Sequence, residues 1–285
     1  MSIKFFGQFL LEENVITPAQ LLKALDYQER KNLKFGQYCL SKGFLRGEAV
    51  TRLNDEQKRT DMRIGELAVQ MRLLNAEQVE HILTMQKNDH VQIGQALVTT
   101  GGVTDEALPE LLARFKADQA EYIPGILNVP EGVSHPELVR DIVDITIKLM
   151  RRIALMEAKA DSGQLTTDEP PANYVVTDIH FSGDVTCNYI LGMPEQAAKR
   201  LASGVVGEDV SKEPRANIYD GVAEFANIAC GNILGRMAQK GKNVDIHPPT
   251  EVTEGQAVVK GRTSARYTLV TTSGYVSLII ADGKA

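Results

Sequence analysis

Apolar and polar positions recur along the first 118 residues with a period of 29. Gly7, Gly36, Gly65 and Gly94 mark the period, and each follows an apolar residue. A second apolar residue stands nine positions after each glycine. A glutamine stands 21 positions after the first three glycines, and Phe115 takes that place after the fourth. Self-similarity at this spacing is typical of helical repeat arrays, so we expect four related units.

Each unit is predicted to fold as a pair of helices. The first helix begins near the glycine and ends at a residue suited to a left-handed turn in units one, two and four. Those residues are Asn14, Gly43 and Gly101, whereas unit three has Arg72. The second helix then opens at an N-cap residue in units one, three and four: Thr17, Asn75 and Thr104. Unit two has Arg46 instead, which predicts a looser turn.

The second helices carry apolar stripes that one helix pair cannot bury alone. The predicted stripes are Leu21, Leu22 and Leu25 in unit one, and Val79, Ile82 and Leu83 in unit three. Four units can bury these stripes by packing against each other. We therefore expect an all-α domain over residues 1–118 that serves as a scaffold or docking domain.

The periodicity stops after residue 118, and proline and glycine punctuate the next stretch. We interpret residues 119–133 as a linker and residues 134–285 as a second domain. Ser134 is suited to cap a new helix, with Glu137 three positions on.

The second domain mixes helical and strand patterns. The helices are predicted over about 136–160, 194–202 and 217–239. The strands are predicted over 175–181, 185–193, 258–263, 266–272 and 275–281, with a polar loop from 161 to 174. This order indicates an α+β domain with an antiparallel sheet. The chain as a whole is therefore expected to be multidomain, all-α followed by α+β.

The helix predicted over 217–239 has two unlike faces. One face carries seven apolar residues: Ile218, Val222, Phe225, Ala226, Ala229, Ile233 and Met237. At 100° per residue, Glu224, Asn227 and Gly231 fall on the opposite face, and Glu224 and Asn227 emerge side by side. Gly235 lies further along this face. Because a glycine inside a helix costs about 1 kcal/mol relative to alanine, we expect something to pack closely there.

Composition narrows the function classes. The chain has 285 residues, of which 43% are apolar and 24% charged, enough for two ordinary cores. A net charge of −6 without a basic stripe argues against nucleic-acid binding. Three scattered cysteines and five dispersed histidines show no metal spacing. No apolar run reaches the ~20 residues of a membrane helix, and acidic residues come too early for a signal peptide, so we expect a cytoplasmic protein.

The segment Glu224-Phe-Ala-Asn227-Ile-Ala-Cys-Gly231-Asn232 resembles the Glu-x-x-Asn-x-x-x-Gly-Asn signature of the CheX/CheC chemotaxis phosphatases. The likeness covers about residues 134–282, and a single Glu-x-x-Asn copy favours CheX. It implies that Glu224 and Asn227 enter the acidic pocket of a phosphorylated CheY-type response regulator. There the asparagine would orient the attacking water, and the glutamate would help anchor the regulator's lysine. The regulator would supply Mg²⁺, so no intrinsic cofactor is expected. The likeness also leaves a homodimer open.

Two other interpretations of this helix remain. Glu224 and Asn227 could be ordinary polar residues on a solvated face. Alternatively, the domain could bind a regulator without catalysis, which would make the chain a non-catalytic adaptor whose two domains both bind signalling partners.

The N-terminal repeats resemble the MshEN family, the N-terminal domains of type II secretion and pilus ATPases. The shared pattern is an arginine, an aliphatic residue and a glycine, followed by a glutamine 21 residues after the glycine. Unit three carries it as Arg63-Ile64-Gly65 with Gln86, and unit two as Lys34-Phe35-Gly36 with Gln57. Units one and four have Phe5 and Gln92 where the arginine belongs. The likeness implies that cyclic di-GMP is a candidate ligand of units two and three; the alternative is a scaffold that keeps only the fold.

Overall fold

The computed structural model describes residues 3–60, 62–120, 127–253 and 256–283. The chain separates into two compact units, Lys4–Ile123 and Pro124–Ala285, with the first three residues grouped with the second unit. The linker predicted over 119–133 lies partly outside the described residues. Leu127 and Val129 at its far end pack against the core of the second unit.

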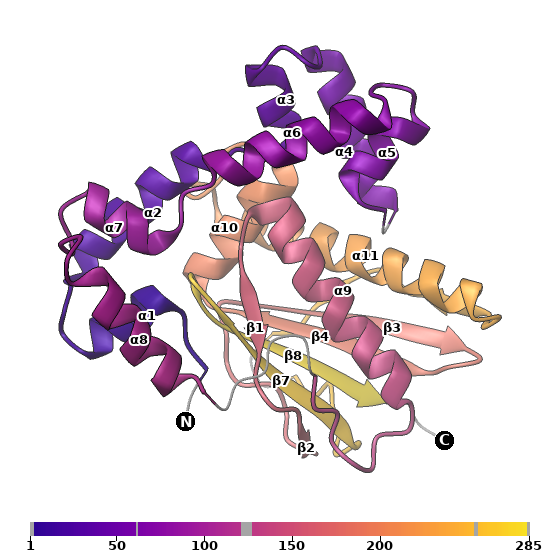
Figure 1. Cartoon of the computed structure of the whole chain (residues 1–285). Helices are drawn as coiled ribbons and strands as arrows, with labels where there is room; N and C mark the ends of the chain where they lie inside the picture. The colour runs from indigo at the N-terminus through magenta and orange to yellow at the C-terminus, as the bar shows by residue number, and fades with distance from the viewer. Residues whose placement is uncertain (1–2, 61, 121–126, 254–255, 284–285) are drawn as a thin grey trace. The chain divides into compact units, whose positions relative to one another are not determined.

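The N-terminal unit consists of four helix pairs, as predicted (Figure 1). The short first helices are α1 (Phe6–Glu12), α3 (Phe35–Ser41), α5 (Ile64–Gln70) and α7 (Ile93–Thr99). The second helices are α2 (Pro18–Lys31), α4 (Gly47–Arg59), α6 (Ala76–Asp89) and α8 (Leu108–Asp118). Each short helix is followed by a turn in which one residue has a left-handed backbone: Asn14 (φ 54°), Gly43 (φ 76°), Arg72 (φ 56°) and Gly101 (φ 78°).

The helix caps follow the sequence in most places. Thr17 and Asn75 accept the N–H groups of Gln20 and Gln78, and both capping boxes are formed. Arg46 makes no side-chain cap, as expected for the looser second unit. Thr104 accepts the N–H of Ala107, but regular α8 begins only at Leu108.

The four pairs bury their apolar faces in two separate cores. One core joins units two and three, and the other joins units one and four. Gln86 Nε2 donates to the Leu33 carbonyl of unit two at 2.8 Å, and Gln28 Nε2 donates to the Val91 carbonyl of unit four at 2.9 Å. Two glutamines of the period, Gln28 and Gln86, therefore form hydrogen bonds across the two pairs of units.

Two of the residues that were predicted to be buried in the apolar stripes are exposed instead. Leu22 is 58% exposed and Leu83 is 45% exposed, whereas the small Ala24 is fully buried on α2. Because the described apolar residues form two separate cores of two units each, the contact on α2 and α6 is narrower than a stripe shared by four stacked pairs.

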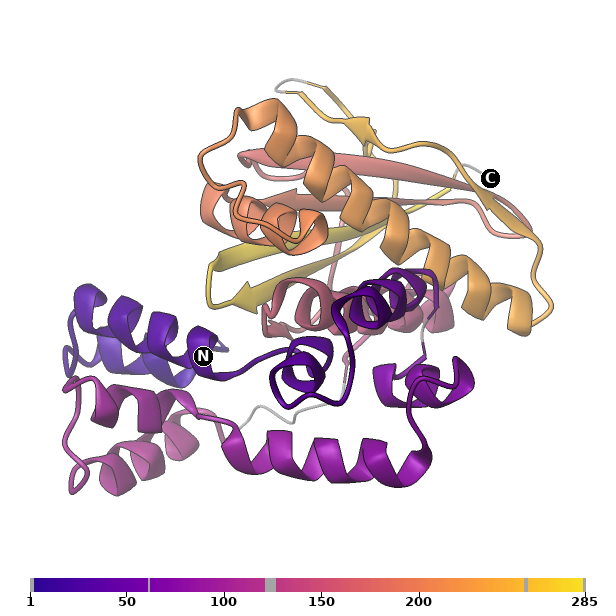
Figure 2. The ribbon, with the colours of Figure 1, turned by 90° about the horizontal axis from the view of Figure 1, so that it is seen from above.

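The C-terminal unit packs three helices on one face of an antiparallel sheet (Figures 1 and 2). The helices are α9 (Pro136–Ala154), α10 (Glu195–Val206) and α11 (Arg215–Gln239). The strand order is β1-β7-β8-β4-β3-β5, with β2 also on β7 and β6 also on β3. The strands are β1 (Ala158–Ala160), β2 (Gln164–Thr166), β3 (Val175–Gly183), β4 (Cys187–Met193), β5 (Val244–Ile246), β6 (Thr250–Glu251), β7 (Ser264–Thr271) and β8 (Gly274–Asp282).

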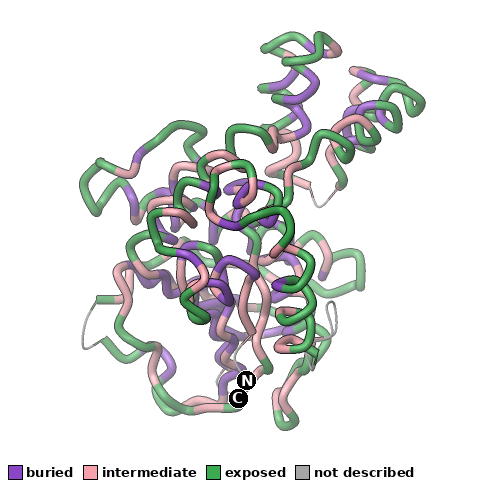
Figure 3. The backbone as a smooth tube through the Cα atoms, turned by 60° about the vertical axis from the view of Figure 1, so that its left-hand side comes forward, coloured by how far each residue is buried: buried purple, intermediate pink, exposed green. Residues whose placement is uncertain are grey.

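The core lies between the helices and the sheet. Buried residues, purple in Figure 3, concentrate in the long strands and on the inner sides of the helices. A smaller apolar cluster covers the other sheet face, where Val258 and Val259 pack against Ile190 and Ile279.

Four predictions for this unit are wrong. The loop predicted over 161–174 contains the short strand β2, which pairs with β7. The helix predicted to residue 160 ends at Ala154, because Leu155 turns left-handed (φ 51°). The strand predicted over 258–263 is a turn, in which Lys260 and Gly261 are left-handed. Ser134 does not cap α9, because its N–H and hydroxyl both bond the Asp282 carboxylate.

Candidate functional site

Helix α11 is fixed by its inner face. All seven residues of its predicted apolar stripe are buried in the core that it shares with α9, α10 and β3. Gly221 allows α11 to approach α10 closely, since a Cβ at this position would lie 2.6 Å from the Cβ of Ala202 on α10. The helix is therefore held in one orientation by apolar packing.

The outer face of α11 is an exposed ridge that holds the predicted pair. Asp220, Glu224, Asn227, Gly231 and Gly235 are all exposed along it. Glu224 and Asn227 stand one helical turn apart. Among the described residues, neither side chain has a hydrogen-bond or ion-pair partner. Both are therefore available to a partner molecule.

The two glycines of this ridge have no internal explanation. We expected something to pack closely on Gly231 and Gly235, but no described atom lies within 4 Å of a Cβ at either position. The helix thus carries the cost of two glycines, about 1 kcal/mol each, without a packing gain inside the described chain. Their backbone is left open for close approach from outside.

A charged network ties the C-terminal half of α11 to α9. Arg236 Nη1 contacts Asp141 Oδ1 at 3.2 Å and Asp144 Oδ2 at 3.1 Å. Lys240 Nζ reaches Asp141 at 2.5 Å, and Lys148 Nζ reaches Asp144 at 2.7 Å. Burial alone would raise the pKa of Asp144, but the hydrogen bonds and charges of Lys148 and Arg236 lower it below its usual value.

Sequence reasoning did not find this network. The only signal is the spacing of Asp141 and Asp144, which puts both on one side of α9. Lys148 is on α9 itself, but the other two cations come from α11, and Arg236 and Asp141 are separated by 95 positions. Only the packed structure brings these groups together.

Some of the residues that were predicted to bind a nucleotide in the N-terminal unit have a structural role. Gly36 and Gly65 lie beneath the second helices, because a Cβ there would stand 2.8 Å from Val50 Cγ1 and 2.6 Å from Val79 Cγ1. Gln86 is engaged by the Leu33 carbonyl.

The remaining candidates lie at helix starts and on α4. Lys34 and Arg63 occupy the N-cap positions of α3 and α5, half-buried and exposed respectively. Gln57 is half-buried on α4. Units two and three share one core, so their candidates belong to one helix bundle.

The class that this site defines is an α+β domain with a free Glu-x-x-Asn pair on a rigid helix. Residues 175–272 match the family model described as chemotaxis phosphatase CheX. The match includes Glu224 and Asn227 and supports a CheX domain in the C-terminal part of the chain.

The solved structures to which the chain is similar include CheX proteins from several bacteria. The chemotaxis protein CheX from Desulfovibrio desulfuricans is 13% identical, with 52% of this chain and 99% of that chain covered and a TM-score of 0.44. CheX from Vibrio vulnificus is 18% identical, with 51% and 98% covered and a TM-score of 0.44. A CheX-CheY-BeF3-Mg complex from Borrelia burgdorferi gives 19% identity, 52% and 98% coverage and a TM-score of 0.44. No curated protein matches the chain.

None of the described helices is long and apolar enough to cross a membrane.

Proposed function

We propose that the C-terminal domain hydrolyses the aspartyl phosphate of a CheY-type receiver domain. The observation that carries this proposal is the exposed, unpartnered pair Glu224 and Asn227, which lies on a buried helix inside the CheX match. Among the described residues, the pair makes no hydrogen bond or ion pair that would give it a structural role.

The chemistry asks little of the phosphatase beyond positioning. The receiver brings the aspartyl phosphate and Mg²⁺, which neutralises charge on the phosphoryl oxygens. Water attacks phosphorus, the bond from phosphorus to the aspartyl oxygen breaks, and the aspartate leaves as a carboxylate. Asn227 would orient that water through its amide, which carries no charge to repel the phosphoryl group. Glu224 would pair with a lysine of the receiver and hold it in register.

The fold supports such positioning. Packing on the inner face of α11 and the Arg236 network fix the helix, so the pair does not depend on a loop for its placement. The exposed backbone at Gly231 and Gly235 leaves room for the receiver next to the pair.

The test is the loss of phosphate from a phosphorylated cognate receiver. Wild-type protein should accelerate it, and Asn227→Ala should reduce that acceleration by ~10²-fold, as for one positioned catalytic group. The thermal midpoint should stay nearly unchanged, because the exposed Asn227 side chain has no hydrogen-bond partner among the described residues. Glu208→Ala, an exposed acid after α10, is the matched control and should behave like wild type.

The adaptor alternative gives a different pattern in the same assay. A non-catalytic adaptor would bind the phosphorylated receiver, but wild-type protein would not shorten the lifetime of the phosphate. That result would replace the phosphatase proposal.

For the N-terminal unit we propose a regulatory or docking role, with cyclic di-GMP as its candidate ligand. The supporting observation is that Lys34 and Arg63 both begin short helices in the two units that share one core. Calorimetry of the full chain with ~100 μM cyclic di-GMP should register even affinities near −5.5 kcal/mol. A heat of binding that is seen for wild type and lost in Arg63→Ala would support cyclic di-GMP as the ligand. If wild type gives no heat of binding, only the docking role remains. A homodimer stays a prediction.

A further inference from the structure

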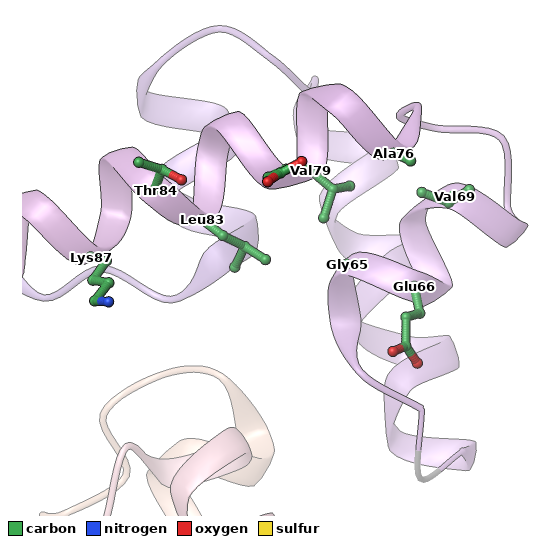
Figure 4. Close-up of a pocket in the computed structure, with 9 residues that line it drawn as sticks. Gly65, Glu66, Val69, Ala76, Val79, Leu83, Thr84 and Lys87 are labelled. Atoms are coloured by element: carbon green, nitrogen blue, oxygen red, sulfur yellow. The ribbon is translucent and has the colours of Figure 1, made fainter.

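An open apolar groove lies between α5 and α6 in the third helix pair (Figure 4). Its volume is about 370 Å³. Val69 and Leu83 form its walls, and they are 37% and 45% exposed. Gly65 and Val79 lie between them and form the floor, where the Val79 side chain packs on Gly65.

The other three pairs provide an internal comparison. The wall positions follow the glycine by four and 18 residues. Residues four after the glycine are Leu11, Leu40, Val69 and Val98, and residues 18 after it are Leu25, Asn54, Leu83 and Leu112. In unit two, Asn54 interrupts the apolar surface beside Gly36. In unit one, both wall residues are only half-exposed.

Two positions on the rim of the groove are acidic only in unit three. Residues one after the glycine are Gln8, Gln37, Glu66 and Gln95, and residues 15 after it are Leu22, Thr51, Glu80 and Pro109. Glu66 and Glu80 therefore put two acids where the other units have none. Together with Lys87 they line the groove, and among the described residues none of the three has an ion-pair partner.

We propose that this groove binds the apolar ridge of a basic amphipathic helix from another protein. Apolar grooves on helical domains accept such helices through anchors at i, i+3, i+4 and i+7. Two unpaired acids against one lysine favour lysine or arginine on the flank of the incoming helix. The same acids oppose a phosphate group, and Val79 covers Gly65 against close approach. A nucleotide therefore fits this groove less well than a cationic helix.

The probe is a labelled 14-residue peptide, with leucine at the helical anchor positions and lysine elsewhere, titrated into the full chain by fluorescence anisotropy. Binding should weaken at least ten-fold in Leu83→Gln. It should also weaken at least ten-fold in Glu66→Lys/Glu80→Lys, which should gain binding to a matched leucine/glutamate peptide. Leu112→Gln changes the same register position in unit four, where the residue is also exposed, and should bind like wild type.

Three outcomes overturn the proposal. The first is equal binding by wild type, Leu83→Gln and the charge-reversed variant, which would show general attraction to an acidic protein. The second is no saturable binding up to ~1 mM peptide, an affinity limit of about −4.1 kcal/mol. The third is displacement of the peptide by cyclic di-GMP, which would assign the groove to the nucleotide.

Discussion

The glycines of the N-terminal period and the two glycines on the ridge of α11 have opposite surroundings. In the N-terminal unit, each glycine of the period lies beneath the aliphatic side chain that follows 14 residues later; a Cβ would stand 2.6 to 2.9 Å from it. On the ridge of α11, a Cβ at Gly231 or Gly235 would meet no described atom within 4 Å. The first set is required by helix packing, and the second is not required by any internal contact.

This difference separates two explanations that the sequence treats alike. A glycine inside a helix indicates a close approach, but not whether the approaching group is a neighbouring helix or another molecule. In the repeats the neighbouring helix accounts for it. On the ridge of α11 no described atom accounts for Gly231 or Gly235. A receiver bound as proposed would account for them, so these glycines support the proposal for the adjacent Glu224 and Asn227.

The largest expected effect is on stability in the repeats. Gly36→Leu should lower the free energy of unfolding by about 1–3 kcal/mol, because the β-branched Val50 above it has little freedom to move. Urea denaturation measures this. Gly47→Leu is the matched control, since a Cβ at Gly47 meets nothing within 4 Å and no such loss is expected. Equal losses in both variants would contradict the packing explanation.

The next largest expected effect is the loss of stability when a glutamine of the period is replaced. Gln86→Ala should cost roughly 1 kcal/mol, because it leaves the Leu33 carbonyl without this donor. Gln57→Ala, which removes the same register position in unit two, should cost less, since no hydrogen bond to the partner unit is seen for it among the described residues. The comparison is made by thermal and urea denaturation. If both variants are neutral, the glutamines do not stabilise the pairing of the units.

On α11, replacing a glycine is expected to raise the free energy of unfolding instead of lowering it. Gly231→Ala should raise the free energy of unfolding by up to about 1 kcal/mol, because alanine is the better helix former and the added methyl group meets no neighbour. At the same time it should weaken binding of the phosphorylated receiver, measured by titration. A variant that is more stable and binds equally well would show that the receiver does not approach this backbone.

The smallest expected effect is a change in the stability of the protein at acidic pH. The pKa of Asp144 is lower in the folded chain than its unfolded value, which is about 3.9. Its contribution to stability is therefore fully present above that pH and is lost as pH falls through the lower folded pKa. The stability difference between wild type and Asp144→Asn should thus shrink below about pH 4, as measured by urea denaturation across pH. A difference that is constant down to pH 3 would contradict the network's role.

The sequence was informative wherever a local pattern decides the structure. The helix pairs, the left-handed turns at Asn14 and Gly43, and the two faces of α11 all follow from spacing and residue type. Which units share a core could not be predicted, because a period identifies equivalent residues and not their partners. The strands β5 and β6 are too short to show alternation. Val258 and Val259 are buried as a strand would be, yet Lys260 and Gly261 turn the chain away.

The central claim is that Asn227 acts on the bound phosphate and Glu224 on the binding itself. The direct measurement is the rate of receiver dephosphorylation as a function of phosphorylated receiver concentration, for wild type and both alanine variants. Asn227→Ala should lower the maximal rate by ~10²-fold with little change in the half-saturating concentration. Glu224→Ala should mainly raise the half-saturating concentration. A wild-type protein that binds the phosphorylated receiver and leaves its decay rate unchanged would contradict the account.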